Sequence, residues 1–392
     1  MSEENVAEPQ KAIFKILGTK FKTIQDFLIK IFNFLYELFF RKRREELNLK
    51  KFDNLSQIAK DYEKRGAYLV ALDYVNTALS MKLDHPIKIS EAYYIRGSIR
   101  ISMKQYVLGI LDLNEAIKID SENSKYFTLK GYAFIQIDKY EDAIKTLNTA
   151  IALKSDSDNN FYNRGLAKYL LSRYFDAIRD FDESIKLNNQ NSKCYLYRGN
   201  SKYLLDLPIE ALKDFNKAIY YDPKNPEAYY RRGCLKRDLE IHEDGLKDLD
   251  IAINIDPTTV EYFQERACIK LKLEKYEEVI EDIDFEKRSI SKNAYLLCLR
   301  GSAKYGLEQK EEALKDFDEA VDLDPNDSLY FYNRGLAKYY FHKKEDAIKD
   351  FNIAIILNPK KEYFEDRSIL KFELGDYYGA IKDSNLAKKL GD

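Results

Sequence analysis

Apolar residues recur along most of this chain at intervals of three and four positions, a pattern that predicts amphipathic helices. The same pattern returns about every 34 residues. The string FYNRGLAKY occurs at Phe161–Tyr169 and again at Phe331–Tyr339, and weaker copies lie between them. A fixed period of this length indicates a tandem array of similar units.

Small residues keep the units in phase. The first small position of each unit is occupied by Ala59, Gly97, Gly131, Gly165, Gly199, Gly233, Ala267, Gly301, Gly335 and Ser368. Alanine usually follows twelve and nineteen residues later, with a large apolar residue such as Phe181 or Phe215 between. Small residues on two helices let their axes approach closely, so each unit is predicted to be a helical hairpin. Prolines fall where units end, at Pro223, Pro257, Pro325 and Pro359.

This arrangement resembles the tetratricopeptide repeat family over residues 52–392. The resemblance implies an all-α, right-handed superhelical solenoid of antiparallel helix pairs, with a concave groove that captures peptides or partner helices. The expected repeats are 52–89, 90–123, 124–157, 158–191, 192–225, 226–259, 260–293, 294–327, 328–360 and 361–392. The repeat over 260–293 departs most, because Val279 and Glu286 occupy small positions. We expect a loosened junction there.

Arginine and aspartate each recur at one equivalent position of successive units, and we call each such series a column. The two columns change together. Arginine precedes the first small position in most units, and aspartate follows that position by fifteen residues. The predicted ion pairs are Arg164 with Asp180, Arg198 with Asp214, and Arg334 with Asp350. The unit that has Thr146 in place of Asp also has Lys130 in place of Arg. A structural pair within or between units is the favoured interpretation; a ladder that binds phosphate or carboxylate is the alternative.

Lysine forms a third column, three residues after the first small position. It comprises Lys168, Lys202, Lys236, Lys270, Lys304, Lys338 and Lys371. The favoured interpretation is a solvated face in which the stems cover apolar surface and the ammonium groups stay in water. The alternative is a row of positive charges that binds acidic partners.

The family resemblance also implies which residues face the groove. On each first helix these lie three and two residues before the small position, and one and four after it. The resulting candidates are Tyr162, Asn163, Leu166, Tyr169, Tyr203, Tyr230, Arg231, Tyr332, Asn333, Leu336 and Tyr339. Aromatic rings beside amide groups suit a peptide groove, although each tyrosine could instead pack on the next unit. For Asn163 and Asn333 we favour binding, because neither core packing nor capping explains asparagine in mid-helix.

The first 51 residues stand outside the repeat. Residues 1–10 are predicted to be a disordered tail, and residues 11–51 an extra N-terminal amphipathic helix with a basic run at Arg41–Arg44. A narrow polar stripe marks this helix at Lys15, Thr19, Lys22, Asp26, Lys30, Asn33, Glu37 and Arg41. Between Phe27 and Phe40, 11 of 14 residues are apolar. As a helix this stretch is about 21 Å long, short of a hydrocarbon core of about 30 Å.

Three interpretations of residues 11–44 remain open. In order of preference, the helix covers the open end of the first repeat, lies in a membrane interface with its basic residues at the headgroups, or pairs with its copy in another chain.

The amino-acid composition argues against several classes of function. Lys plus Arg (64) nearly balances Asp plus Glu (66), which argues against nucleic acid as the main partner. The four cysteines and three histidines are too scattered for a metal site or a disulfide framework, and free thiols fit the cytoplasm. No secretory signal is evident.

The sequence therefore predicts a non-catalytic protein–protein interaction scaffold without a cofactor. It shows no Ser/His/Asp or Cys/His set and no Gly-rich phosphate loop. A membrane-associated adaptor anchored by residues 11–44 is the first alternative, and an RNA-binding helical-repeat protein is the second.

Overall fold

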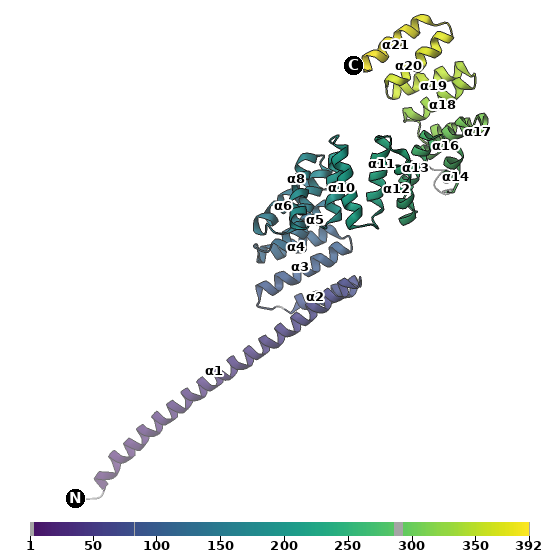
Figure 1. Ribbon diagram of the computed structural model, residues 1–392. Coiled ribbons are helices and arrows are strands. Elements are labelled where there is room, and N and C mark those ends of the chain that lie inside the picture. Colours follow the sequence, from purple (N-terminus) through teal and green to yellow (C-terminus); the bar gives the residue numbers. More distant parts are fainter. Residues whose placement is uncertain (1–3, 82, 286–292, 392) are drawn as a thin grey trace. The chain divides into compact units, whose positions relative to one another are not determined.

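The computed structural model describes residues 4–81, 83–285 and 293–391. Within these ranges the chain forms twenty helices in consecutive antiparallel pairs and no strand (Figure 1). The prediction of an all-α array of helix pairs is confirmed.

The helices belong to two compact units, which divide between Leu187 and Asn188. The first unit contains α1 (Glu4–Lys64), α2 (Tyr68–Ser80), α3 (Pro86–Ser102), α4 (Tyr106–Ile119), α5 (Ser124–Ile135), α6 (Tyr140–Leu153), α7 (Asp158–Leu170) and α8 (Tyr174–Leu187). The second contains α9 (Ser192–Tyr203), α10 (Pro208–Tyr221), α11 (Pro226–Asp238), α12 (His242–Ile255), α13 (Val260–Lys272), α14 (Tyr276–Phe285), α16 (Ala294–Gly306), α17 (Lys310–Leu323), α18 (Ser328–Tyr340), α19 (Lys344–Leu357), α20 (Lys361–Glu373) and α21 (Tyr377–Gly391).

The two helices of a pair approach closely because glycine faces a large ring. A Cβ atom added to Gly165 would lie 2.9 Å from the ring of Phe181, and one added to Gly199 would lie 2.7 Å from the ring of Phe215. Both rings are buried. A larger residue at the first small position would force the helices apart, and this steric limit explains the column of small residues.

The turns inside the pairs use left-handed backbone at the same register throughout. The residue seven positions after each first small position has a positive φ, and the set is Gly66, Lys104, Asp138, Ser172, Asp206, Glu240, Glu274, Glu308, His342 and Gly375. Only the first and last members are glycine. The other eight hold φ between 56° and 64°, where a side chain adds strain.

Neighbouring pairs share their cores. In the second unit, one cluster joins buried residues of α13, α14, α16, α17, α18 and α20, among them Val279, Phe317 and Tyr363. Val279, expected to mark a loosened junction, is fully buried in this cluster. Glu286 lies outside the described residues.

The third helix begins earlier than expected. The sequence predicts a repeat starting at residue 90, whereas α3 starts at Pro86 and is 17 residues long. Proline is favoured at the first helical position because its missing N–H would be unpaired there and its φ suits a helix.

The N-terminal segment and the first repeat share one helix. The sequence predicts a tail over residues 1–10 and a boundary near residue 51, but α1 is helical from Glu4 and continues to Lys64. Residues 1–3 lie outside the described residues. Pro9 lies near the start of this helix, and from residue 11 to residue 64 there is no proline and only one glycine, Gly18, so no proline interrupts the rest of it. Phe52 and Ala59 at its C-terminal end are buried in the core of the first repeat.

The preferred interpretation of residues 11–44 as a cap is not supported where side chains are described. Ten apolar residues between Phe27 and Phe40 are exposed, so this stretch covers no part of the repeats. Among the described side chains of α1, Leu49 is the first that is partly buried. It lines a hollow with Lys42, Glu45 and Glu46 of the same helix and with Leu83, Asp84 and His85.

Candidate partner-binding face and its supporting network

The arginine and aspartate columns meet inside each helix pair. Arg164 Nε donates to Asp180 Oδ2 at 2.9 Å, and its Nη2 donates to Asp180 Oδ1 at 2.6 Å. Arg198 makes the same two bonds to Asp214 at 2.9 and 2.5 Å. These aspartates are buried, and the paired fork holds the first helix against the second.

Most of these arginines also reach back to the preceding pair. Arg164 Nη1 donates to Asn148 Oδ1 of α6 at 2.7 Å, and Arg334 Nη1 donates to Asp318 Oδ1 of α17 at 2.8 Å. The same bond joins Arg232 to Asn216 and Arg300 to Asp284, both at 2.7 Å. One guanidinium thus ties three helices from two repeats.

The lysine column is not a solvated face. In all seven members Nζ lies 2.6–2.9 Å from the same aspartate that the arginine holds, and six of these aspartates are buried. The reason is the spacing: Arg164 and Lys168 are four residues apart on one helix and therefore lie on the same side, opposite Asp180. Both charged columns are bonded inside the protein.

The repeat over residues 124–157 has Lys130 and Thr146 where other repeats have arginine and aspartate, and it shows the effect of losing the carboxylate. Thr146 bonds to its own helix through Asp142 O instead of meeting Lys130. Burial lowers the pKa of Lys130, although Asp142 opposes this effect. Without an aspartate at position 146, Lys130 is a half-buried amine whose charged form is less favoured than in water.

The candidate tyrosines link consecutive first helices. In the second unit, the ring of Tyr332 packs against that of Tyr363 of α20, with centroids 4.4 Å apart and planes tilted by 30°, and the Tyr332 hydroxyl donates to Asp366 Oδ2 at 2.6 Å. Tyr339 donates to Glu373 Oε1 at 2.7 Å. Tyr230 lies 5.0 Å from Tyr262 of α13. These rings pack on the next repeat and remain partly exposed.

The other tyrosines among the candidates contact their own pair or the next helix. The ring of Tyr162 lies 6.2 Å from the ring of Phe181, and the ring of Tyr169 lies 5.8 Å from that of Tyr174. Tyr203 shares a hydrogen bond with Asp238 of α11. Burial and this bond raise the pKa of Tyr203 to about 12.

Two aliphatic and three polar candidates complete the set. Leu166 is half-buried beside a cluster formed mainly by α5 and α6 of the preceding repeat, and Leu336 is half-buried beside the core of its own repeat. Asn333 Nδ2 donates to Cys298 Sγ of the preceding repeat at 3.1 Å, so a contact between repeats accounts for this asparagine in mid-helix. Asn163 is buried. Arg231 bonds to Glu227 of its own helix at 2.6 Å.

A charged network on this face escapes sequence analysis. Arg237 contacts Asp238 at 2.9 Å and also bonds to Glu265 of α13, while Asp238 accepts from Tyr203 of α9. These four residues run through three consecutive first helices. Burial raises the pKa of Glu265, and the nearby Arg237 offsets part of this rise. The only sequence signal is that Tyr203 and Arg237 share one register, four after the small position.

The cysteines near this network are structural. Burial raises the pKa of Cys234 and of Cys298 to about 12 in each case. Cys268 lies 3.1 Å from the Tyr295 hydroxyl, and burial raises its pKa too. Thiols held in the neutral form are poor nucleophiles and poor metal ligands.

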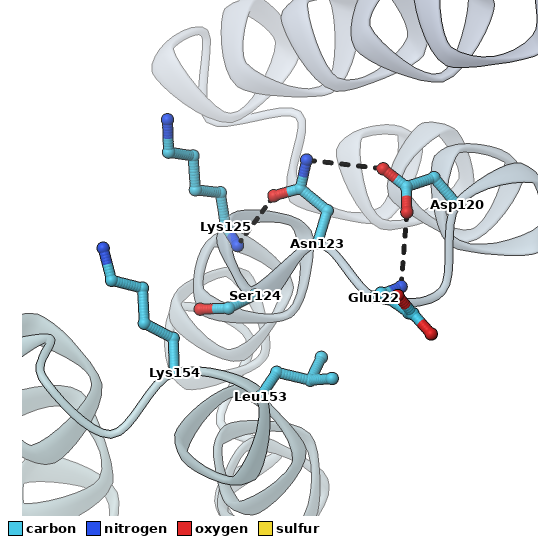
Figure 2. A pocket seen from close by; sticks show the side chains of 7 residues that line it. All are labelled: Asp120, Glu122, Asn123, Ser124, Lys125, Leu153 and Lys154. Atoms are coloured by element: carbon cyan, nitrogen blue, oxygen red, sulfur yellow. Dashed lines mark hydrogen bonds between the residues drawn. The ribbon is translucent and has the colours of Figure 1, made fainter.

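An open hollow of about 360 Å³ lies in the first unit among the end of α4, the start of α5 and the end of α6 (Figure 2). Asp120 accepts from the Asn123 side chain and from Glu122 N, while Asn123 caps α5 by accepting from Lys125 N. These polar groups close helix ends. Among the described residues, no group of three His, Cys, Asp or Glu is placed to hold a metal ion.

Comparison with known proteins gives two family matches. Residues 131–172 match a model described as TPR repeat, and residues 294–327 match one described as tetratricopeptide repeat. No curated protein matches the chain.

Several solved structures resemble the chain. One is a tetratricopeptide repeat protein from Parabacteroides merdae, at 17% identity and a TM-score of 0.47 over 74% of this chain and 99% of that one. Yeast Tom70 aligns at 15% identity and a TM-score of 0.42 over 87% and 92% of the two chains. YrrB, described as a TPR protein with an unusual peptide-binding site, aligns at 20% identity and a TM-score of 0.39 over 48% and 95%.

Proposed function

Because this chain is a tetratricopeptide repeat protein, we propose that it is a scaffold that holds other proteins on the outward side of its first helices. The family consists in general of non-catalytic interaction modules. We call the proposed surface the first-helix face: the side chains one, four and five residues after the first small position, together with those two and three before it.

One observation carries the proposal: aromatic side chains on this face are fixed by bonds from the next repeat while part of each ring stays exposed. Tyr332 and Tyr339 are both held by acidic groups of α20. A ring that is already immobile loses little conformational entropy when a partner covers it. Tyrosine also offers apolar area and a polar edge at once, which suits protein interfaces.

Exposed apolar residues continue the face. Tyr340 is 58% exposed, Ile369 53% and Phe372 62%, all on α18 and α20. Ile369 shares the register of Leu166 and Leu336, and Phe372 shares that of Tyr169, Tyr203 and Tyr339. A partner segment with apolar side chains at its contact points would cover these residues and leave Asp366 and Glu373 in their present bonds.

The charge distribution favours a protein partner over RNA. The arginines and lysines that repeat along the array are bonded to buried aspartates, so they are not available to bind the phosphates of an RNA backbone.

A random peptide library displayed on phage tests the proposal with the full chain as bait. Peptides enriched on the protein should bind the double variant Ile369→Glu/Phe372→Glu about tenfold more weakly or worse, since an interface loses an apolar anchor and gains a charge at each site. Helicity measured by circular dichroism verifies that the variant stays folded.

The matched control is Ile356→Glu/Ile381→Glu, which places the same two charges on the second helices α19 and α21 at residues that are 81% and 62% exposed. Binding should survive this change. Failure to enrich any peptide, or equal binding by both variants, would refute the first-helix face as the partner site.

A further inference from the structure

The N-terminal helix exposes a continuous apolar surface. Phe27, Phe32, Phe34 and Phe39 are each 60% or more exposed, and six further apolar residues between Ile29 and Phe40 are exposed as well. A contiguous apolar surface of this kind on a folded protein marks a site of contact with another apolar phase.

The polar residues of this stretch occupy one narrow sector. At about 100° per residue, Lys30, Asn33, Glu37 and Arg41 fall within roughly 80° of the helix circumference. The apolar residues from Phe27 to Phe40 cover roughly 240° of it. The helix is therefore apolar on most of its circumference and polar along one line.

This distribution does not fit a two-stranded coiled coil. Such a pair buries a seam of about two residues in seven, and most of the phenylalanines here would remain in water. Nor does it fit a helix that crosses a bilayer: no helix in the described part of the chain is long and apolar enough to span a membrane.

A cationic segment follows the apolar one directly. Arg41, Lys42, Arg43 and Arg44 are consecutive, so they point to all sides of the helix. Arg41 bonds to Glu45 at 3.0 Å with both side chains mostly exposed. Arg43 and Arg44 have no acidic partner among the described residues. This cluster is complementary to the phosphates of an anionic membrane surface.

We propose that residues 27–44 of α1 dock this protein on an anionic membrane surface. The apolar sector lies at the boundary between headgroups and acyl chains, and Arg41–Arg44 contact lipid phosphates. The line formed by Lys30, Asn33 and Glu37 faces water. Since α1 is continuous with the first repeat, docking would bring the whole array, with its first-helix face, to the membrane.

Vesicle flotation of the full chain tests the proposal. Vesicles of an equal mixture of phosphatidylcholine and phosphatidylserine should carry the protein up the gradient, and phosphatidylcholine alone should carry about tenfold less. Phe32→Glu/Phe39→Glu should abolish flotation, and Arg43→Glu/Arg44→Glu should reduce it to the level seen with neutral vesicles. Ile356→Glu/Ile381→Glu, which adds the same two charges at exposed sites on second helices of the repeats, should float like the unmodified protein.

The alternative partner for the apolar stretch is a second copy of this chain. Light scattering after gel filtration tests this alternative, because it measures whether the protein is a monomer or a dimer. A protein that fails to float on either vesicle, or a dimer that Phe32→Glu/Phe39→Glu converts to monomer without any flotation, would overturn membrane docking. Equal flotation on both vesicles would overturn the role of the basic cluster. These outcomes are independent of peptide binding at the first-helix face.

Discussion

Arg334 and Asp350, sixteen residues apart, join the two helices of their repeat by two parallel hydrogen bonds. Nε lies 3.0 Å from Oδ2 and Nη2 lies 2.7 Å from Oδ1. Lys338 Nζ reaches Oδ2 at 2.7 Å, and the third arginine nitrogen bonds to Asp318 of the preceding repeat. The aspartate is thus a buried centre on which two cations of one helix converge.

Loss of this arginine should destabilise the array locally. We expect Arg334→Ala to lower the free energy of unfolding around α18 and α19 by about 2–3 kcal/mol, because it leaves a buried carboxylate with one cation instead of two. Arg334→Lys should recover only part of the lost stability. A single ammonium group cannot make the two bonds to Asp350 and the bond to Asp318 at once. Hydrogen exchange of α17–α19 amides measures the effect.

Lys349→Ala is the control for that experiment. Lys349 pairs with Asp346 on the exposed side of the same helix pair, at 2.8 Å. An exposed pair three residues apart contributes little, so exchange should be nearly unchanged. If both variants exchange alike, the arginine column does not stabilise the stack.

The left-handed turns offer a way to stabilise the protein. Asp206 holds φ at 58°, whereas Gly66 and Gly375 occupy the same register in the first and last repeats without a side chain. We expect Asp206→Gly to raise the free energy of unfolding by about 0.5–1 kcal/mol, because relief of the strain outweighs the added freedom of the unfolded chain. Urea denaturation followed by circular dichroism measures this.

The same substitution inside a helix should act in the opposite direction. Lys349→Gly lies in the middle of α19 and should cost about 1 kcal/mol. A loss of stability from Asp206→Gly would show that the aspartate side chain contributes more in its turn than the backbone strain removes.

How far the sequence predicts this molecule depends on whether a contact lies within one repeat. The small residues and the Arg164–Asp180 spacing follow from packing inside one hairpin, so a period of 34 reveals both. The contact of Lys168 with Asp180 follows from the same spacing, since Lys168 lies four residues from Arg164 on one helix. The usual exposure of lysine favours a solvated face instead, and that interpretation is wrong here.

Contacts between repeats are harder to predict. The network of Tyr203, Asp238, Arg237 and Glu265 depends on how neighbouring hairpins rotate against each other, which a repeat pattern does not specify. The sequence does not predict the left-handed turns either. Lys104, Ser172 and Asp206 share a backbone conformation, but their side chains have no chemistry in common that would reveal it.

The N-terminal helix shows a third limit. Its periodicity predicts a helix, and the structure contains one. Whether Phe32 and Phe39 are covered depends on the presence of a complementary surface, which the count of apolar residues does not reveal.

The cysteines should resist modification in the folded protein. Because burial raises the pKa of Cys234 and Cys298 to about 12, almost no thiolate exists at pH 8. We expect these two thiols to react with a disulfide reagent at least about a hundredfold more slowly than a free cysteine. Mass spectrometry of the labelled peptides identifies each site. Full reactivity after denaturation is the control, and rapid labelling of Cys234 in the native protein would contradict the burial.

The last repeat should lose stability in acid. Burial alone would raise the pKa of Asp383, but hydrogen bonds from Arg367 and Lys371 hold it below its usual value of 3.8. A carboxyl group whose folded pKa is depressed contributes stability that is present above its unfolded pKa and disappears as the pH falls through the folded one. The contribution of Asp383 should therefore be complete at pH 7 and decline below about pH 4. Asp383→Asn should destabilise α20–α21 at pH 7. The difference from the unmodified protein should shrink as the pH falls from about 4 through the lower folded pKa of Asp383, because Asp383 then becomes neutral like asparagine. A difference that stays constant across this range, measured by hydrogen exchange corrected for pH, would mean that packing of Asp383, rather than its charge, stabilises the final pair.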